Sequence, residues 1–199
     1  HTRFKCDWSS DVCSSDLNAE QAKNIVLSLI GENESVGVGG SVTLDQLGLL
    51  DALADSGRAV YSTILAARRG GDKQEMRRLG VAADVYLSST NALTLEGDLI
   101  NIDGTGNRVA GMIYGPKKVI IVAGRNKLTK NPHTAIARIK KQACPPNARR
   151  LGLSTPCATQ GACADCDSPQ RMCNVVVRIQ WPPHGKEYHV VLVDGDFGY

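Results

Sequence analysis

The chain has 199 residues, a length that suits one domain with a substantial core. Its formal net charge is +3, its basic residues are dispersed and its aromatic content is 5%, so composition and charge do not favour a nucleic-acid-binding protein. No apolar run in the sequence approaches membrane-spanning length, since the longest, around residues 119–123, is the size of a strand.

The first residues, HTRFKCDWSSDVCSSDL, show no apolar period, no helix cap and no strand alternation. Residues 7–17 match one translated reading frame of a common sequencing adapter. We therefore interpret residues 1–17 as a non-native segment and expect residues 18–199 to form one domain. The removed segment has two basic and three acidic residues, a net of −1, so the charge becomes +4. Under this interpretation, Cys6 and Cys13 carry no functional information. The alternative is that residues 1–17 are a genuine serine-rich tail.

The next part of the chain alternates between helical and strand periodicity. The pattern predicts helices over residues 19–30, 44–54 and 72–83, and strands over residues 35–38, 59–64 and 85–88. Such a β-α-β-α-β rhythm favours a parallel sheet with helices packed against it.

The rest of the chain adds antiparallel pieces. The pattern predicts a β-hairpin within NALTLEGDLINIDGTG, a short helix over residues 107–114, a buried strand over 118–122, a helix over 132–142, and a closing hairpin from strands at 175–181 and 187–193. We see no internal repeat and no linker. The expected fold is therefore one α/β domain, an open and mostly parallel sheet flanked by helices with added antiparallel hairpins.

The stretch SVGVGGSVTLDQ places a glycine-rich turn between a predicted strand and a predicted helix. Such a turn directs backbone N–H groups into the crevice above the sheet, where anions bind. We expect Gly39, Gly40, Ser41 and Thr43 to contact a ligand there. The alternative is a tight turn in which Ser41 or Thr43 only caps the following helix.

Further polar residues follow other predicted strands. Because ligands of open α/β sheets bind at the carboxyl ends of the strands, these residues are expected to share one pocket with the glycine-rich turn. Arg108 and Lys127 suit a carboxylate or phosphate, whereas the DGTGN segment is also ordinary turn chemistry. The predicted ligand-binding residues of this group are Asn91, Asp103, Gly104, Gly106, Asn107, Arg108, Asn126 and Lys127.

Four cysteines fall within the stretch CATQGACADCDSPQRMC, with the spacing C-x5-C-x2-C-x6-C: Cys157, Cys163, Cys166 and Cys173. The spacing indicates a metal site, because the x2 pair can place two thiolates on one ion or cluster edge and the outer pair can close the other side. Disulfides, a redox pair and inert thiols are the alternatives. Four thiols serve zinc or an iron–sulfur cluster equally well, and Cys144 is not an expected ligand. Tightly spaced thiols also favour a reducing cytoplasm.

Several motifs together resemble the lactate-utilisation (LUD) domain family, in its branch with a cysteine-rich carboxyl-terminal stretch. They are GVGGSVTLDQLGLL, TNALTLEGDLINIDGTGNRVAGMIYGPKKVIIVAGRNK, NARRLGLSTPC and HVVLVDGDFG. The resemblance implies the isomerase and CoA-transferase-like α/β fold and a link to bacterial lactate oxidation, where family members accompany iron–sulfur proteins. It therefore inclines the metal prediction towards a 4Fe–4S cluster over zinc.

Three functions remain open from the sequence. The first is an accessory or subunit of an iron–sulfur electron-transfer system for lactate oxidation, which binds a small anionic ligand. The second is a stand-alone isomerase or CoA-transferase-like enzyme, for which Glu96 and Asp103 are the candidate catalytic carboxylates. The third is a ligand-binding module with a structural zinc. The histidines are scattered and form no evident Ser/His/Asp constellation.

Overall fold

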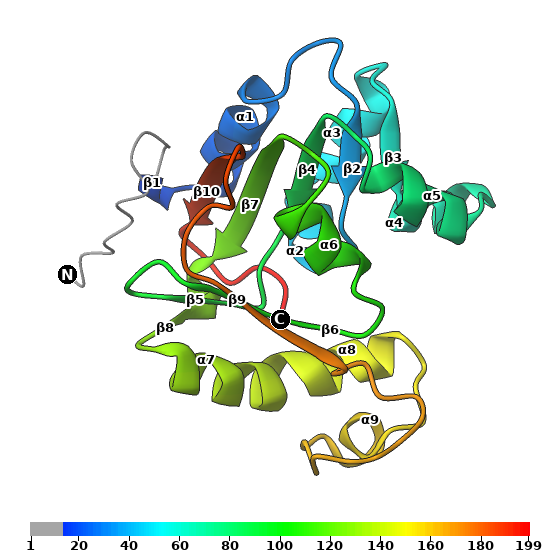
Figure 1. The fold of residues 1–199 in the computed structure, drawn as a ribbon, viewed down its shortest axis with the longest axis vertical. Helices are drawn as coiled ribbons and strands as arrows, with labels where there is room; N and C mark the ends of the chain where they lie inside the picture. Colours follow the sequence, from blue (N-terminus) through cyan, green and yellow to red (C-terminus); the bar gives the residue numbers. More distant parts are fainter. Residues whose placement is uncertain (1–13) are drawn as a thin grey trace.

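The computed structural model describes residues 14–199 and contains two sheets (Figure 1). The larger sheet has the strand order β1-β10-β7-β4-β2-β3, and all its strand pairs are parallel. Its strands are β1 (Ser14–Leu17), β2 (Val36–Val38), β3 (Val60–Ser62), β4 (Val85–Ser88), β7 (Lys118–Gly124) and β10 (Glu187–Val193). The expected open parallel sheet is therefore present, and the carboxyl ends of its strands meet at one edge.

A smaller mixed sheet lies beside the larger one, with the strand order β8-β5-β6-β9. The predicted hairpin forms its centre, because β5 and β6 pair antiparallel with Leu93 opposite Leu99. β8 joins β5 in parallel, and β9 joins β6 antiparallel. The strands are β5 (Ala92–Thr94), β6 (Leu99–Asp103), β8 (Leu128–Thr129) and β9 (Val175–Ile179).

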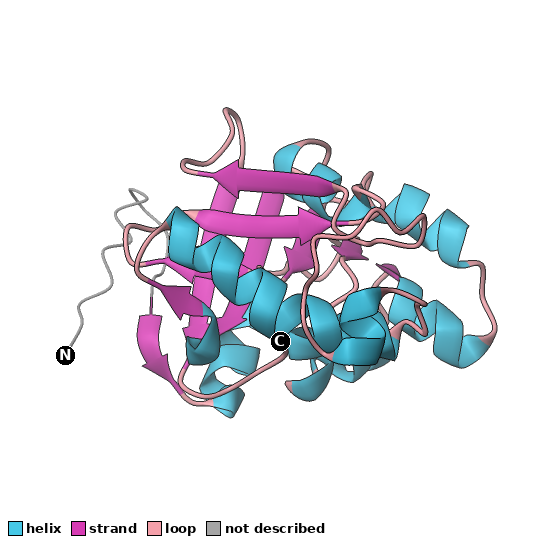
Figure 2. Cartoon of the chain, turned by 90° about the horizontal axis from the view of Figure 1, so that it is seen from below, coloured by secondary structure: helices cyan, strands magenta, loops and turns pink. Residues whose placement is uncertain are grey.

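Helices connect and cover the sheets. Those before β4 are α1 (Ala19–Ser28), α2 (Val42–Gln46), α3 (Leu49–Asp55), α4 (Thr63–Arg69) and α5 (Lys73–Gly80). Those after β4 are α6 (Asn107–Ile113), α7 (Pro132–Arg138), α8 (Cys144–Arg150) and α9 (Pro156–Gln160). A π-helical turn, Ile139–Ala143, joins α7 to α8 in one helical run, which lies across the smaller sheet when the molecule is seen from below (Figure 2).

The core is layered because both faces of the larger sheet are buried. Along β7, Ile120 and Val122 pack in one apolar cluster with α1, α2 and α3. Val119 and Ile121 point the other way, into a second cluster shared with the smaller sheet and α6. This strict alternation of two apolar faces is the pattern of a strand at the centre of a layered sheet. A third cluster fills the space between the smaller sheet and the run from α7 to α8.

Several expected elements have other bounds in the structure, and the helix predicted over residues 72–83 is the shorter α5. The helix predicted over residues 44–54 is two helices, because Gly48 adopts a left-handed conformation with φ of 63° between α2 and α3. The strand predicted over 59–64 ends at Ser62, whose side chain caps α4. The helix predicted over 132–142 continues through the π turn to Arg150, since the following prolines occupy the first turn of α8, where they are tolerated.

The predicted closing hairpin is wrong. β9 pairs with β6 in the smaller sheet, whereas β10 pairs in parallel with β7 in the larger sheet. The burial of the two strands explains the difference: from Tyr188 to Val193 every residue of β10 is buried, while β9 is largely exposed. A strand that is apolar on both faces belongs inside a sheet covered on two sides and not in an exposed hairpin.

The segment interpreted as non-native lies mainly outside the described residues. Its last part, Ser14–Leu17, forms β1 at the edge of the larger sheet and pairs with β10 with an irregular register. Among the helices between residues 14 and 199, none combines the length and the apolar character that a bilayer crossing requires.

Candidate functional site

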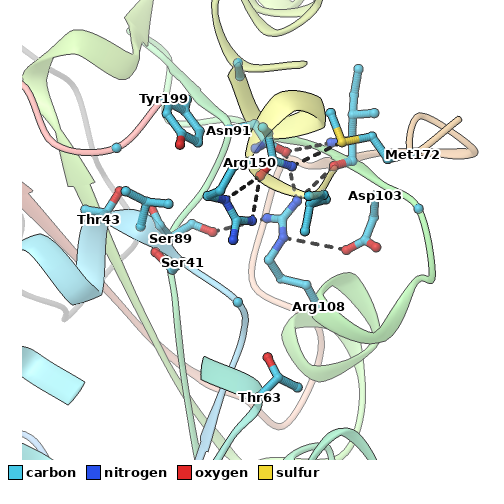
Figure 3. Close-up of a pocket in the computed structure, with 18 of the residues that line it drawn as sticks. Ser41, Thr43, Thr63, Ser89, Asn91, Asp103, Arg108, Arg150, Met172 and Tyr199 are labelled. Carbon is cyan, nitrogen blue, oxygen red and sulfur yellow. Dashed lines mark hydrogen bonds and ion pairs between the residues drawn. The ribbon is translucent and has the colours of Figure 1, made fainter. Parts of the chain in front are cut away.

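A pocket of about 560 Å³ opens at the carboxyl edge of the larger sheet (Figure 3). The segments that follow β2, β4 and β7 all contribute to it, through Ser41, Ser89 and Lys127. Residues of α4 and α5 line another side, and the run from α7 to α8 a third. The site thus lies where the topology of a parallel sheet predicts ligand binding.

The lining of the pocket is strongly basic. Among the described residues that line it, Asp103 is the sole acid, whereas the basic ones are Arg68, Lys73, Arg77, Arg108, Lys127 and Arg150. Arg68 is already paired on the protein surface with two aspartates of α2 and α3. Enough positive charge remains around the pocket to favour an anionic ligand.

Lys127 is the least exposed of the basic residues that line the pocket. Its side chain is only 3% exposed, and its Nζ lies 2.7 Å from Thr43 Oγ1 and 2.8 Å from Ser89 Oγ. No carboxylate within residues 14–199 forms an ion pair with it. Burial lowers the pKa of Lys127 to about 7, and the positive charges of Arg138 and Arg108 add to the effect. An anionic ligand can therefore supply the negative charge that this buried amine lacks among the described residues.

The carboxyl-terminal segment borders this amine. Gly198 accepts a hydrogen bond from the Asn126 side chain and donates one to Gln46, while Thr43 donates to the carbonyl of Phe197. A Cβ atom on Gly198 would lie 2.4 Å from Thr43 Oγ1 and 3.2 Å from the Lys127 amine. The absence of a side chain at this position therefore keeps the space around the amine open.

Arg108 has a different environment, although it lies in the same pocket. Its two Nη atoms donate to four protein acceptors: the carbonyls of Ser89 and Ile102 and the side-chain oxygens of Asn101 and Asn91. Figure 3 shows Arg108 turned towards Asn91, with Asp103 on its other side. With its Nη hydrogens engaged, Arg108 braces the pocket wall and has little capacity left for a ligand.

Asp103 is similarly occupied. Its Oδ1 accepts hydrogen bonds from the backbone of Thr105 and Gly106, and its Oδ2 lies 3.6 Å from Arg108 Nε. This carboxylate stabilises the loop before α6. Both of its oxygens are engaged, so it is not positioned to act as a base. The other candidate carboxylate, Glu96, is exposed in the hairpin turn and does not line the pocket.

Most of the predicted ligand residues come together, although no bound ligand tests their role. Those that line the pocket are Gly40, Ser41, Thr43, Asn91, Asp103, Gly104, Asn107, Arg108 and Lys127. Ser41 also caps α2 through the backbone N–H of Leu44, as the alternative interpretation expects. Three predicted residues lie outside the lining. Gly39 is buried against Ser88 and Arg108, Gly106 precedes α6 with φ of 86°, and Asn126 holds the carboxyl-terminal segment.

Sequence reasoning missed several lining residues. Ser89 follows β4 by one residue. Its position at the same strand end as Asn91 was the sequence signal that could have identified it as a lining residue. The walls from α4, α5 and α8 depend on tertiary packing that no local pattern indicates. The missed residues include Thr63, Arg68, Lys73, Arg77, Ser89, Asn147, Arg150 and Tyr199.

The cysteine-rich stretch extends from the far end of the run from α7 to α8 (Figure 1). Its four thiols are free and partly buried, with Cys157 on α9 and Cys173 just before β9. Cys144 is buried on α8 and lines the pocket. Burial, together with the smaller effect of the charges of Cys173, Cys163 and Cys157, raises the pKa of Cys144 to about 12. Cys144 therefore lies close to the predicted ligands.

The donor set suits zinc or an iron–sulfur cluster chemically, since it offers four thiolates without histidine. The geometry does not fit as it stands. In the described part of the chain, no three or more His, Cys, Asp or Glu side chains are gathered for a metal ion. Metal binding by Cys157, Cys163, Cys166 and Cys173 stays a prediction that would require the loop to rearrange.

The comparisons with known proteins concern the chain as a whole. No curated protein matches the sequence. Among solved structures, one similar chain is a DUF162 family protein from Deinococcus radiodurans, with 11% sequence identity, a TM-score of 0.48 and coverage of 90% of this chain and 86% of that one. The family model of the LUD domain matches residues 17–193, nearly the whole chain. The chain therefore belongs to the LUD domain family.

Proposed function

We propose that this LUD-domain protein binds a small organic anion in the pocket at the carboxyl edge of its larger sheet. We further propose that it serves lactate oxidation as an accessory or subunit of an iron–sulfur electron-transfer system in the cytoplasm. The family membership supports the link to lactate utilisation. The observation that carries the anion site is Lys127, a buried amine that lines the pocket and has no acid partner among the residues that the structure describes.

The arrangement gives the anion a defined place. Thr43 and Ser89 accept two of the hydrogens of the Lys127 ammonium, so the third is available to a ligand oxygen. Asn91 lines the same pocket, and its Nδ2 has no partner within the described residues, so it offers a second donor. The surrounding basic residues add long-range attraction without close contact.

An isomerase or CoA-transferase reaction is less well supported. Both reactions need a positioned and unengaged carboxylate as base or nucleophile. Asp103 is held by two backbone N–H groups and Arg108, and Glu96 lies outside the pocket. We therefore favour binding of an anion over carboxylate-based catalysis.

Calorimetric titration with L-lactate, pyruvate and inorganic phosphate tests the anion site. We expect at least one of these anions to bind, and Lys127→Met to weaken its binding by about 10- to 100-fold, the effect of one charged hydrogen bond. Lys130→Met is the matched control, because Lys130 is exposed and does not line the pocket. Equal affinities in the wild type and Lys127→Met, or no binding of any of the three anions, would reject the proposal.

The iron–sulfur part of the proposal rests on the donor set and on the family. Protein prepared without oxygen should contain stoichiometric iron and sulfide if the thiol stretch holds a cluster, or zinc if the site is structural. Cys163→Ser should abolish the metal, whereas Cys144→Ser should retain it. Full metal content in Cys163→Ser, measured by elemental analysis, would rule out the predicted ligand set.

A further inference from the structure

The hydrogen bonds around Lys127 are compatible with a neutral amine. Thr43 directs its own hydroxyl hydrogen to the carbonyl of Phe197, at 3.1 Å, and Ser89 directs its hydrogen to the carbonyl of Thr90, at 3.3 Å. Both hydroxyl oxygens must therefore accept hydrogens from Lys127. Two Nζ hydrogens are thus used in either charge state: at the remaining position the ammonium has its third hydrogen, and the neutral amine has its lone pair.

The charges around Lys127 also favour its neutral form. Arg138 on α7 and Arg108 on α6 are the charged groups that act on the amine, and both are cationic. The nearby acids interact with these arginines: Asp103 forms an ion pair with Arg108, and the charge of Asp196 acts on Arg138. A desolvated lysine beside other cations retains a large neutral fraction near neutral pH, which is the condition for amine nucleophiles.

We propose that Lys127 forms an imine with the carbonyl carbon of a small anionic ketone or aldehyde, of the class of 2-oxo acids. The inference rests on the proposed function, because the carboxylate of such a compound would be the anion that the pocket binds. Asn91 offers that carboxylate a donor, and neutral Lys127, which lines the same pocket, has its lone pair at the position that Thr43 and Ser89 leave unused.

The step is a condensation and needs no oxidant. The amine nitrogen attacks the carbonyl carbon, a C–N bond forms, and the carbonyl π electrons move to oxygen. One amine hydrogen then passes to that oxygen, for which the Ser89 hydroxyl, 2.8 Å from Nζ, is placed as a relay. The second amine hydrogen leaves with the hydroxyl group as water when the C=N bond forms. The products are one imine and one water.

Reductive trapping tests the imine directly. The wild-type protein is incubated with pyruvate, treated with borohydride and mapped by mass spectrometry. We expect one stoichiometric reduced adduct on Lys127 and none on Lys130. Lys127→Arg keeps the charge but has no amine nucleophile, so it should give no adduct, whereas Lys130→Met should be labelled like the wild type. The wild-type result does not depend on how any variant folds.

The pH dependence separates this reaction from simple anion binding. With a pKa of about 7, the neutral fraction of Lys127 rises about tenfold between about pH 6 and about pH 8, so adduct yield should rise while anion affinity falls. Pyruvate that binds by calorimetry but leaves no adduct would overturn the imine and leave the anion site standing. Absence of both binding and adduct would overturn both proposals, and labelling spread over surface lysines would overturn the imine.

Discussion

Replacing Lys127 with methionine should remove a pH dependence of folding stability that the buried amine creates. The pKa of Lys127 is about 7 in the folded protein against an ordinary value of 10.5. Between these values the unfolded chain binds a proton that the folded chain does not, so the free energy of unfolding rises with pH. Each pKa step is worth about 1.36 kcal/mol, and integration from about pH 7 to about pH 9 gives a rise of about 2 kcal/mol.

Urea denaturation of the wild type, Lys127→Met and Lys130→Met at both pH values measures this contribution. Other groups titrate over the same range, but they do so equally in all three proteins, so the comparison isolates Lys127. The wild type and Lys130→Met should gain about 2 kcal/mol more than Lys127→Met on going to the higher pH. An identical pH response in Lys127→Met would show that the amine is charged and solvated in the folded state, which would refute the reasoning.

Two further substitutions probe the walls of the pocket, and a third tests Glu96, which lies outside its lining. Gly198→Ala would place a methyl group 2.4 Å from Thr43 Oγ1, so we expect at least about tenfold weaker anion binding by calorimetry. Gly185→Ala is the control for backbone strain, because Gly185 has a similar positive φ but open space around it. This control should bind the anion like the wild type. Arg108→Met should cost about 3–5 kcal/mol in urea denaturation, because it removes the ion pair with the buried Asp103 and four hydrogen bonds to protein acceptors. Arg125→Met, at an exposed ion pair, should cost less than about 1 kcal/mol. Glu96→Gln should change stability by less than about 0.5 kcal/mol and leave ligand binding intact, and a clear loss of ligand affinity would restore Glu96 as a functional residue.

The sequence predicts the location of the pocket because that location depends on topology. Alternating helices and strands indicate a parallel sheet, and the residues after β2, β4 and β7 must then share one edge. The same reasoning cannot distinguish Lys127 from Arg108, since both are basic residues near strand ends. What separates them is the set of acceptors around each side chain: Arg108 donates to four acceptors, and Lys127 meets two hydroxyls.

The prediction that β9 and β10 form a hairpin is wrong for a physical reason. Two apolar strands around a Pro-Gly turn satisfy the local pattern of a hairpin, and only the burial of both faces of β10 reveals its place in the larger sheet. The contact of Gly198 and Phe197 with α2 was equally beyond local reasoning, because it joins segments more than a hundred residues apart. Long-range pairing of this kind depends on the whole core and not on any short stretch.

The π turn between α7 and α8 gives this helical run a place where its length can change by one residue without turning the pocket wall. Each residue of a helix advances it by about 100° around its axis, and a π turn accommodates one residue more than an α-helical turn. Deleting one residue from Ile139–Ala143 would therefore convert the π turn into an α-helical turn and leave α8 close to its present orientation, with Cys144 and Asn147 still in the pocket wall. The same deletion in a run without a π turn would rotate every later residue by about 100° around the helix axis, so this turn lets the length of the run vary while the wall that faces the amine keeps its place.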